Sequence, residues 1–390
     1  MLEWKLIRLG DISKTNKNSY YPKDNWKFVN YLDTGSLTEN KITELQYINT
    51  KTDKMPSRAR RKVIKNSILY STVRPNQLHY GIIKEPVDNL LVSTGFTVID
   101  VDTNKAIPEF IYYLLIQNNT TEQLQAIAEQ SVSTYPSIKP SDIENLEFKL
   151  PNLIIQSKIV SILDTIDSKI RQNEKINNNL LQQLHILYLS LFCDCAMDTP
   201  LGDVVATTSG GTPSRKHDEY YSDSSICWVK SKELLGNYIH ETKEHINDLA
   251  IKKSSAKLLP EHSVLIAMYG ATVGAYGVIS KPMTCNQAVC ALLCNENYPY
   301  TYLFQIAYES QQKFINLAVG SAQQNISQVL IKQLNLHSDL DIIQKFHGLA
   351  LPMHKEIESL QAENMRLSAL RDNLLPKLMS GDLDVSNIDI

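Results

Sequence analysis

Residues 159–191 read IVSILDTIDSKIRQNEKINNNLLQQLHILYLSL, and their seam positions recur by alternating steps of four and three residues. The seam consists of Ile159, Leu163, Ile166, Ile170, Asn173, Asn177, Leu180, Leu184, Leu187 and Leu191. Sustained 3-4 spacing over about four heptads is typical of a coiled coil. Asn173 and Asn177 interrupt the apolar run, and a buried Asn fixes register and partner at a cost in stability. The stretch therefore predicts a helix of some 35 residues, about 50 Å long, that pairs with one particular helix.

A second seam with the same spacing lies later in the chain. It consists of Phe346, Ala350, Met353, Ile357, Leu360, Asn364, Leu367, Arg371, Leu374 and Leu378. Pro352 and Pro376 fall within this helix, and we expect a bend near each of its ends because an interior proline removes a helical hydrogen bond. The middle parts of the two seams, Ile166–Leu184 and Ile357–Leu367, are the predicted contacts between the helices. The alternative is that each helix packs on its own globular domain as an ordinary amphipathic helix.

Five short motifs recur in the same order in the two halves of the chain, at offsets between 188 and 196 residues. The pairs are Leu9–Ile12 with Leu201–Val204, Ser67–Leu69 with Ser263–Leu265, Tyr80–Ile83 with Tyr276–Ile279, Phe110–Leu114 with Tyr300–Phe304, and Ile138–Phe148 with Ile326–Leu336. Each match alone is weak, but five in order within so narrow a spread of offsets indicate an internal duplication. Duplication favours pairing of the two long helices, because helices related by a pseudo-two-fold axis run antiparallel.

Each half reads as short β-type runs followed by helix. Gly, Pro, Asn and Asp separate the runs, which in the first half are 27–32, 67–70, 80–83 and 95–99. Pro108 is placed as a first-turn residue of a helix, and Ser141–Glu144 has the spacing of a capping box. In the second half, the Gly-rich run 270–277 reads as strand, turn and strand.

These patterns together predict an α+β fold. Two related globular α+β domains are joined by two long helices that pair as an antiparallel coiled coil, forming a pseudo-two-fold internal repeat. The predicted segments are a first domain at 1–150, a first long helix at 151–197, a second domain at 198–338, and a second long helix with a C-terminal tail at 339–390.

Composition narrows the class of protein. No stretch approaches the roughly 18 uncharged apolar residues of a membrane span, and the first residues lack a signal-peptide pattern, so we expect a soluble, cytoplasmic chain without a membrane partner. The six cysteines show no Cys-x-x-Cys spacing and no accompanying His-x₃₋₅-His pair, so no metal site is predicted. A net charge of −3 argues against gripping DNA by bulk electrostatics, so any nucleic-acid binding would need local patches or partner subunits.

An enzymatic function has little support. The chain has no Gly-x-x-x-x-Gly-Lys-Ser/Thr phosphate loop, and it lacks the Asn/Asp-Pro-Pro-aromatic motif of enzymes that methylate a base. The Gly-rich run 270–277 lacks both a following Lys and a dinucleotide fingerprint. We therefore predict no catalytic residues and no cofactor bound by this chain.

DNA-contacting candidates are more visible. Residues 51–74 hold eight Lys and Arg against one acid, and Arg suits both phosphate clamping and bidentate contact with guanine, while Asn and Gln suit adenine. The candidates in the first half are Lys54, Arg58, Arg60, Arg61, Lys62, Arg74, Asn76 and Gln77. Those in the second half are Thr212, Ser214, Arg215, Lys216, Lys230, Lys232, Gln323, Gln324 and Asn325. The alternatives are a solvated basic surface in the first half and an ordinary polar turn around 320–325.

Several of these motifs resemble one known family. The residues that carry the resemblance are Ser209–Ser214, Tyr220–Tyr221, Ile226–Val229, Val264–Gly274, Gly320–Ser327 and Leu370–Gly381. They are similar to the target recognition domains and terminal helix of the specificity subunit of type I restriction-modification systems, over essentially the whole chain. The first half matches less literally. Where the family often has Pro-x₃-Glu-Gln at the start of each long helix, this chain has Pro151-x₄-Gln156 in the first half and Asp339-x₄-Gln344, without the proline, in the second. The two glutamines keep the repeat offset of 188 residues.

The resemblance implies a non-catalytic subunit in which each domain reads one half of a bipartite double-stranded DNA site. It also implies two modification subunits that carry S-adenosylmethionine, dock on the helices and methylate adenine, and restriction subunits that can join them. From the residues alone, a protein-binding coiled-coil scaffold with two adhesive heads is the alternative.

Overall fold

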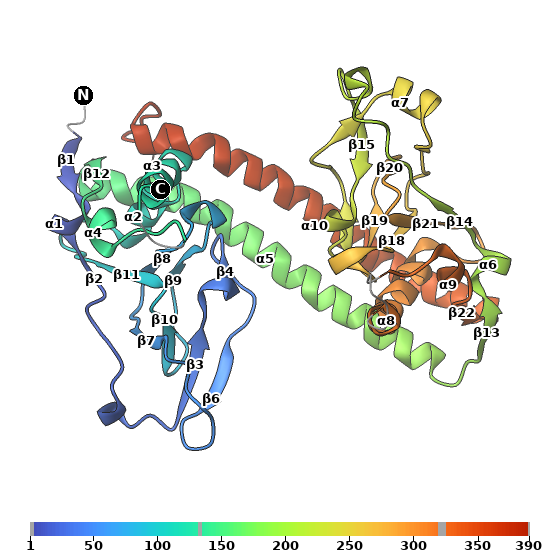
Figure 1. The fold of residues 1–390 in the computed structure, drawn as a ribbon, viewed down its shortest axis with the longest axis horizontal. Coiled ribbons are helices and arrows are strands. Elements are labelled where there is room, and N and C mark those ends of the chain that lie inside the picture. The colour runs from blue at the N-terminus through green and yellow to red at the C-terminus, as the bar shows by residue number, and fades with distance from the viewer. Residues whose placement is uncertain (1–3, 132–134, 319–324, 389–390) are drawn as a thin grey trace. The chain divides into compact units, whose positions relative to one another are not determined.

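The computed structural model describes residues 4–131, 135–318 and 325–388. The chain divides into unit 1, Met1–Ser168 with Leu367–Ile390, and unit 2, Lys169–Arg366. Each unit therefore contains one globular domain and parts of both long helices (Figure 1).

Unit 1 is built on two four-stranded sheets, ordered β2-β11-β8-β9 and β6-β3-β10-β7. Its strands are β1 Lys5–Arg8, β2 Ser13–Thr15, β3 Phe28–Leu32, β4 Leu37–Thr38, β5 Lys41–Ile42, β6 Gln46–Asn49, β7 Ala59–Lys62, β8 Ser67–Ser71, β9 Tyr80–Ile83, β10 Leu90–Ser93, β11 Phe96–Val101 and β12 Glu147–Leu150. Its shorter helices are α1 Leu9–Ile12, η1 Pro22–Asp24, η2 Thr34–Ser36, η3 Pro75–Gln77, α2 Pro108–Leu115, α3 Asn118–Glu129 and α4 Pro140–Glu144.

Unit 2 has a five-stranded sheet, β14-β21-β18-β19-β16, and a three-stranded sheet, β17-β15-β20. Its strands are β13 Met197–Pro200, β14 Ala206–Ser209, β15 Ile226–Val229, β16 Asn237–Ile239, β17 His245–Ile246, β18 Val264–Ala267, β19 Tyr276–Ile279, β20 Thr284–Cys285, β21 Val289–Leu293 and β22 Asn335–His337. Its shorter helices are α6 Leu201–Val204, η4 Asp218–Tyr220, η5 Ser231–Glu233, α7 Asp248–Lys253, η6 Gly270–Thr272, α8 Tyr300–Ala318 and α9 Gln328–Lys332.

The two units repeat one topology. The order β2-β11-β8-β9 in unit 1 corresponds to β14-β21-β18-β19 in unit 2, and the terminal pair β1-β12 corresponds to β13-β22. In the second sheet of each unit a parallel pair, β3 with β10 or β15 with β20, is flanked by an antiparallel strand, β6 or β17. The predicted duplication is therefore confirmed.

The local sequence explains why these elements form. Pro108 occupies the first turn of α2, where its missing N–H would have no helical partner. The Gly-rich run after β18 forms the predicted turn, since β18 and β19 pair antiparallel across it. In unit 1, Phe110 and Leu124 are fully buried with Ile68 in one core, and burying such a side chain contributes about 1.5–3 kcal/mol.

The long helices are α5, Leu153–Phe192, and α10, Leu340–Ser380. In unit 1, Leu163 near the start of α5 shares a core with Leu378 near the end of α10. In unit 2, Phe192 at the end of α5 packs with Phe346 near the start of α10. The helices therefore pair antiparallel, as the duplication predicts, and α10 continues through both prolines.

The seam residues differ in how deeply they lie between the helices. Those that are buried are Ile166, Asn173, Asn177, Leu184, Ile357 and Leu360. Those that are half-buried are Ile170, Leu180, Asn364 and Leu367. After Leu184 the deepest positions of α5 are Tyr188 and Phe192, beside the half-buried Leu187 and Leu191.

One glutamine side chain near the start of each long helix forms a hydrogen bond with the globular domain of the same unit. Gln156 accepts a hydrogen bond from the Ile107 backbone N–H at 2.9 Å, and Gln344 donates one to the Glu296 carbonyl at 2.6 Å. These are the two glutamines that keep the repeat offset in the sequence, so the duplication extends into the helix starts.

The predicted capping box at Ser141 is wrong by two residues. Helix α4 begins at Pro140, and the Lys139 backbone N–H donates to the Asp142 carboxylate at 2.7 Å. Proline favours the first helical position, which moves the cap to Lys139 and makes Asp142 the acid that closes it.

Within the described ranges, no helix is both long enough and apolar enough to cross a membrane. All six cysteines are free thiols.

Candidate nucleic-acid interface

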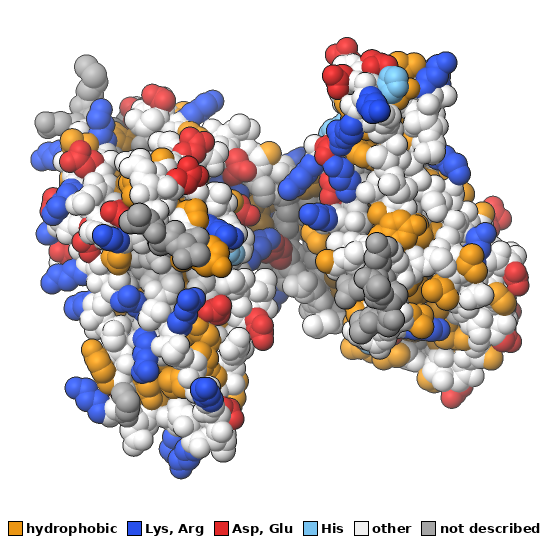
Figure 2. All heavy atoms as spheres, viewed as in Figure 1, with side chains coloured by type: hydrophobic (Ala, Val, Ile, Leu, Met, Phe, Trp, Pro, Cys, Tyr) orange, Lys and Arg blue, Asp and Glu red, His pale blue; other side chains and the backbone are white. Residues whose placement is uncertain are grey.

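The basic stretch of unit 1 surrounds β7, an edge strand of the sheet β6-β3-β10-β7. Lys54, Arg58 and Arg60 are exposed there, and Arg60 Nε donates to the Ser57 carbonyl at 3.3 Å. Figure 2 shows Lys and Arg side chains scattered over the part of unit 1 that contains β3, β6 and β7. Exposed guanidinium and ammonium groups of this kind can contact DNA phosphates without rearrangement of the fold.

Arg61 and Lys62, predicted beside them, are engaged within the fold. The Nε of Arg61 is buried without a hydrogen-bond partner among the described residues, and burial lowers the pKa of its guanidinium. Lys62 forms an ion pair with Asp24 at 2.9 Å, and its ammonium lies 5.2 Å from the ring centroid of Trp26. Lys62 therefore helps to hold β7 in place, through partners that the sequence pattern did not reveal, whereas Arg61 is partly withdrawn from solvent.

The turn between β8 and β9 presents the remaining candidates of unit 1. Arg74, Asn76 and Gln77 all have exposed side chains. The Arg74 guanidinium lies 5.0 Å from the ring centroid of Tyr135, and the Asn76 backbone N–H donates to Gln125 Oε1 at 3.2 Å. The turn is thus anchored by its backbone while three side chains suited to base edges face solvent.

The candidate loop of unit 2 begins with two glycines, Gly210 and Gly211. A Cβ on Gly211 would lie 2.3 Å from the Ser255 backbone, so only glycine fits there. The Gly211 carbonyl accepts a hydrogen bond from Trp228 Nε1 at 3.0 Å, which ties the loop to β15. The exposed side chains that follow are Thr212, Ser214, Arg215 and Lys216.

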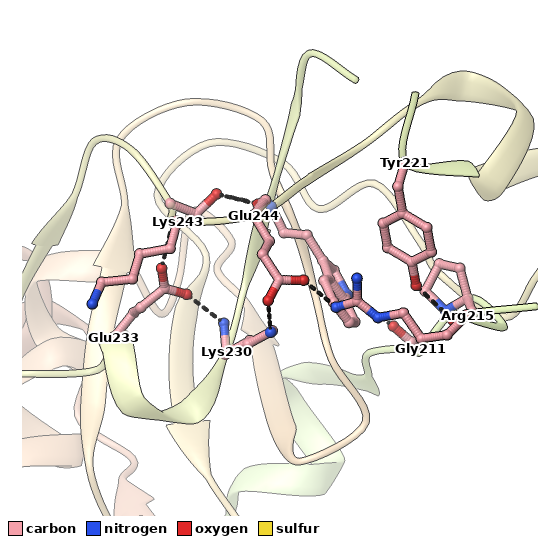
Figure 3. A network of polar contacts seen from close by, with 10 residues as sticks. Gly211, Arg215, Tyr221, Lys230, Glu233, Lys243 and Glu244 are labelled. Carbon is pink, nitrogen blue, oxygen red and sulfur yellow. Dashed lines mark hydrogen bonds and ion pairs between the residues drawn. The ribbon is translucent and has the colours of Figure 1, made fainter. Parts of the chain in front are cut away.

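Two of the candidate cations of unit 2 converge on one carboxylate (Figure 3). Arg215 and Lys230 both form ion pairs with Glu244. Aromatic rings back the pair: the Arg215 guanidinium lies 4.2 Å from the Tyr221 ring, and the Lys230 ammonium lies 5.2 Å from the Trp228 ring. In Figure 2 the part of unit 2 around β15 carries acidic and basic side chains next to one another.

The electrostatics of this cluster follow from its geometry. Hydrogen bonds from Lys230 and then Arg215 lower the pKa of Glu244, so the carboxylate stays ionised and balances part of their charge. The arrangement of two cations around one anion is the one a phosphate group would require. Lys232, the other candidate nearby, is exposed.

The third predicted element of unit 2 is described only in part. Gln323 and Gln324 lie outside the described residues. Asn325 forms an isolated antiparallel bridge with Tyr269, so it lies beside the turn between β18 and β19. That juxtaposition joins segments 56 positions apart in sequence and could not be predicted from either segment alone.

The structure gathers one cluster that the sequence analysis missed. Cys227, Glu241 and His245 place their ligand atoms within 4.8 Å of one another, although no metal site was predicted. Burial would raise the pKa of Glu241, but hydrogen bonds from Cys227, the Thr242 backbone, His245 and Lys281 lower it to about 2. Because the Lys281 ammonium lies 3.3 Å from the same carboxylate, the cluster already contains the cation that balances it. Its geometry is that of a polar network supporting β15 and β17.

Two units of one topology, each with cationic or amide side chains on exposed loops, define a duplicated recognition protein with a paired-helix core. The family model of the type I restriction modification DNA specificity domain matches residues 1–182 and again residues 197–338. The chain belongs to this family.

Characterised relatives extend over nearly the full length. The chain is 26% identical over 464 residues to the type I restriction enzyme HindI specificity subunit of Haemophilus influenzae, covering 98% of this chain and 100% of the relative. It is 24% identical to the type I restriction enzyme MjaIX specificity subunit of Methanocaldococcus jannaschii, covering 98% and 94%. The crystal structure of a type I restriction-modification system S subunit from M. genitalium is similar in fold, with a TM-score of 0.59, 15% identity and coverage of 99% and 97%.

Proposed function

We propose that the chain is the DNA-recognition subunit of a type I restriction-modification assembly, and that each unit reads one half of a bipartite double-stranded target. The observation that carries the proposal is the duplication: the family model matches twice, and the two units share one strand order. A repeated reading domain suits a target made of two separate parts. The α5–α10 pair would hold the domains at a set spacing, which would fix the number of unread bases between them.

Differences between the units support two different half-sites. Unit 1 exposes Arg74, Asn76 and Gln77 on its β8–β9 turn, whereas unit 2 exposes Tyr269, Gly270 and Ala271 on the corresponding β18–β19 turn. Such side chains differ in the donors and acceptors that they offer to base edges. Two copies of one fold that differ in their exposed loops can recognise two different DNA sequences.

Charge supports a division of labour between subunits. The chain has a net charge of −3, so bulk electrostatics contributes little to DNA binding, and partner subunits would be needed for many of the phosphate contacts. Partner modification subunits would supply them, together with S-adenosylmethionine and the transfer of a methyl group to adenine. Two such subunits would dock on the paired helices, and restriction subunits could join the assembly. This chain would bind no cofactor and catalyse no step.

The test is co-expression of the chain with the modification subunit of its own system, followed by mapping of modified adenines across the host genome. The expected result is one motif of two defined parts separated by a constant number of unspecified bases, present only when the chain is expressed. A modification pattern that is the same with and without the chain would reject the proposal. A protein-binding scaffold, the other function considered, would give that second result, and membership of the DNA specificity family does not favour it.

A further inference from the structure

The β8–β9 turn of unit 1 and the β18–β19 turn of unit 2 are built by the same backbone contacts. The matched contacts are Ser71 N to His79 O with Ala267 N to Ala275 O, Gln77 N to Arg74 O with Val273 N to Gly270 O, Ile138 N to Thr72 O with Ile326 N to Met268 O, and the bridge Val73–Ser137 with the bridge Tyr269–Asn325. The offsets are 196 residues in the turns and 188 in the segments bonded to them, which are those of the sequence repeat. The turns are therefore equivalent parts of the duplicated fold.

Equivalence extends to the backbone conformation. Gly270 and Gly274 have φ angles of 71° and 79°, in the left-handed region that favours glycine. Their counterparts in unit 1, Arg74 and Leu78, have φ angles of 48° and 57° although neither is glycine. Non-glycine residues in this region are strained, and such strain gathers at functional sites.

The two strained side chains of unit 1 have different surroundings. Leu78 is half-buried and packs against the core of unit 1, so it fills the space below the turn. Arg74 is exposed, and its contact with Tyr135 orients the guanidinium without using its N–H donors on a carboxylate. An oriented guanidinium with available donors can pair bidentately with the two acceptors on the edge of guanine.

Unit 2 presents a different surface at the same place. A Cβ on Gly270 would meet no atom within 4 Å, so the position opens to solvent and leaves room for a side chain. The exposed residues of this turn are Tyr269, Gly270 and Ala271, and Thr272 is half-exposed. The backbone is thus kept while the side chains differ, as expected of an element that distinguishes two half-sites.

This inference rests on the proposed function. We propose that these two turns are equivalent base-reading elements. The residue at the first left-handed position of each turn, Arg74 in unit 1 and Gly270 in unit 2, determines part of the specificity of its unit. Arg74 reads a guanine edge in the half-site of unit 1. Unit 2, with glycine there, makes no such contact and reads with Tyr269 and Thr272. Anchoring of the Asn76 backbone to Gln125 on α3 holds the unit 1 turn rigidly enough for readout.

Reciprocal substitutions test the proposal. Arg74→Gly removes the guanidinium and relieves the strained φ, so the fold should be kept. Gly270→Arg adds a guanidinium where the structure leaves space. Each variant is co-expressed with the modification subunit, its assembly is checked by co-purification, and the modified motif is mapped genome-wide. Arg74→Gly should reduce discrimination at one guanine of one half by about 5- to 100-fold and leave the other half unchanged. Gly270→Arg should alter only the opposite half.

Three further variants make the outcome decisive. Asn89→Gly is the matched control, since Asn89 has a φ of 54° in unit 1 but lies just before β10, away from the β8–β9 turn; it should leave the motif unchanged. Lys149→Ala controls for loss of one positive charge, because Lys149 is exposed on β12. Asn76→Ala removes an exposed amide while keeping the turn's backbone hydrogen bond, so it should also change the unit 1 half-site.

Two results would overturn the inference, and they differ. Assembled Arg74→Gly, Asn76→Ala and Gly270→Arg complexes that all modify the wild-type motif would reject the reading turns and leave the proposed function intact. A wild-type complex that modifies no defined motif would reject the proposed function and this inference with it.

Discussion

The side-chain amide of Asn173 in α5 donates a hydrogen bond to Oδ1 of Asn364 in α10 at 2.9 Å. The same nitrogen also lies 2.7 Å from Glu363 Oε2. One polar interruption of each seam therefore meets the other, and a slip of either helix by one turn would place Asn173 against an apolar residue. The pair fixes the register of the helices within unit 2.

Asn173→Ala should destabilise unit 2 by about 1–3 kcal/mol, because Asn173 is fully buried and its loss leaves Oδ1 of Asn364 without its donor. Chemical unfolding followed by circular dichroism measures the change. The matched control is Asn178→Ala, an exposed position of the same helix, which should shift stability by no more than about 0.5 kcal/mol. Equal effects of the two substitutions would contradict the register role of Asn173.

Mutations in the basic stretch of unit 1 should distinguish residues that bind DNA from residues that stabilise the fold. Replacing Arg58 and Arg60 with Ala should weaken DNA binding by the assembled complex and reduce the slope of log K against log salt by about 1–2, because each phosphate contact contributes about 0.9. Lys62→Ala should instead lower thermal stability, since it removes the ion pair with Asp24 and the contact with Trp26. Binding titrations at several salt concentrations measure this slope. An unchanged slope for the double variant would show that these two arginines do not contact DNA phosphates.

Glu244→Gln should strengthen binding of the complex to duplex DNA and steepen its salt dependence. The substitution removes the carboxylate that pairs with both Arg215 and Lys230, so both cations become available to phosphate. The comparison is Glu296→Gln, which removes an exposed carboxylate of the same unit and should change affinity far less. If the two variants bind alike across salt concentrations, Glu244 does not restrain the cations.

As the pH falls, unit 2 should lose stability at pH values above those at which most carboxylates become protonated. Burial, then the nearby His347 and His262, lower the pKa of His354 to about 3, and its Nδ1 lies 2.9 Å from the Tyr238 hydroxyl. Since the folded-state pKa lies below the unfolded value of 6.5, the unfolded chain takes up a proton that the folded chain refuses. Stability contributed by neutral His354 is therefore present above pH 6.5 and is lost as pH falls from there toward 3, by roughly 1 kcal/mol per pH unit.

The measurement is the free energy of unfolding of unit 2 between pH 7.5 and 5, for the wild type and for His354→Phe. The variant should be less stable at pH 7.5, because the Tyr238 hydroxyl loses its hydrogen bond with His354, but its stability should fall less steeply with acid. His337 also has a pKa lowered by burial, so some slope remains in the variant. Parallel curves for the two proteins would exclude His354 as the acid-sensitive group.

Much of the fold follows from patterns within short windows of sequence. The 3-4 seams identify α5 and α10, Pro108 marks the start of α2, and β-type runs locate β3, β8, β9 and β11. The repeat offsets add a long-range constraint, because two copies of one pattern must form one topology. Register and partner choice at Asn173 were also implied by the seam, since a buried amide needs a partner at the same level.

The binding surface was less predictable, because the state of a charged side chain depends on residues distant in sequence. Lys62 and Arg215 look like free cations in the sequence, but Asp24 and Glu244 reach them only in the folded chain. The Cys227, Glu241 and His245 cluster likewise forms only because β15 pairs with β17. The repeat offset of 196 residues on both sides of the turn aligns Arg74 with Gly270, but their shared left-handed backbone could be seen only in the fold.

The most direct test of the account is a domain exchange. Residues 1–150 are replaced by the corresponding domain of another member of the family that modifies a different motif, and modified adenines are mapped in cells that also express the modification subunit. The account predicts a bipartite motif in which one half has changed to that of the donor, while the other half and the gap between them stay the same. A motif that stays wholly unchanged after the exchange would contradict the claim that each unit reads its own half of the DNA target.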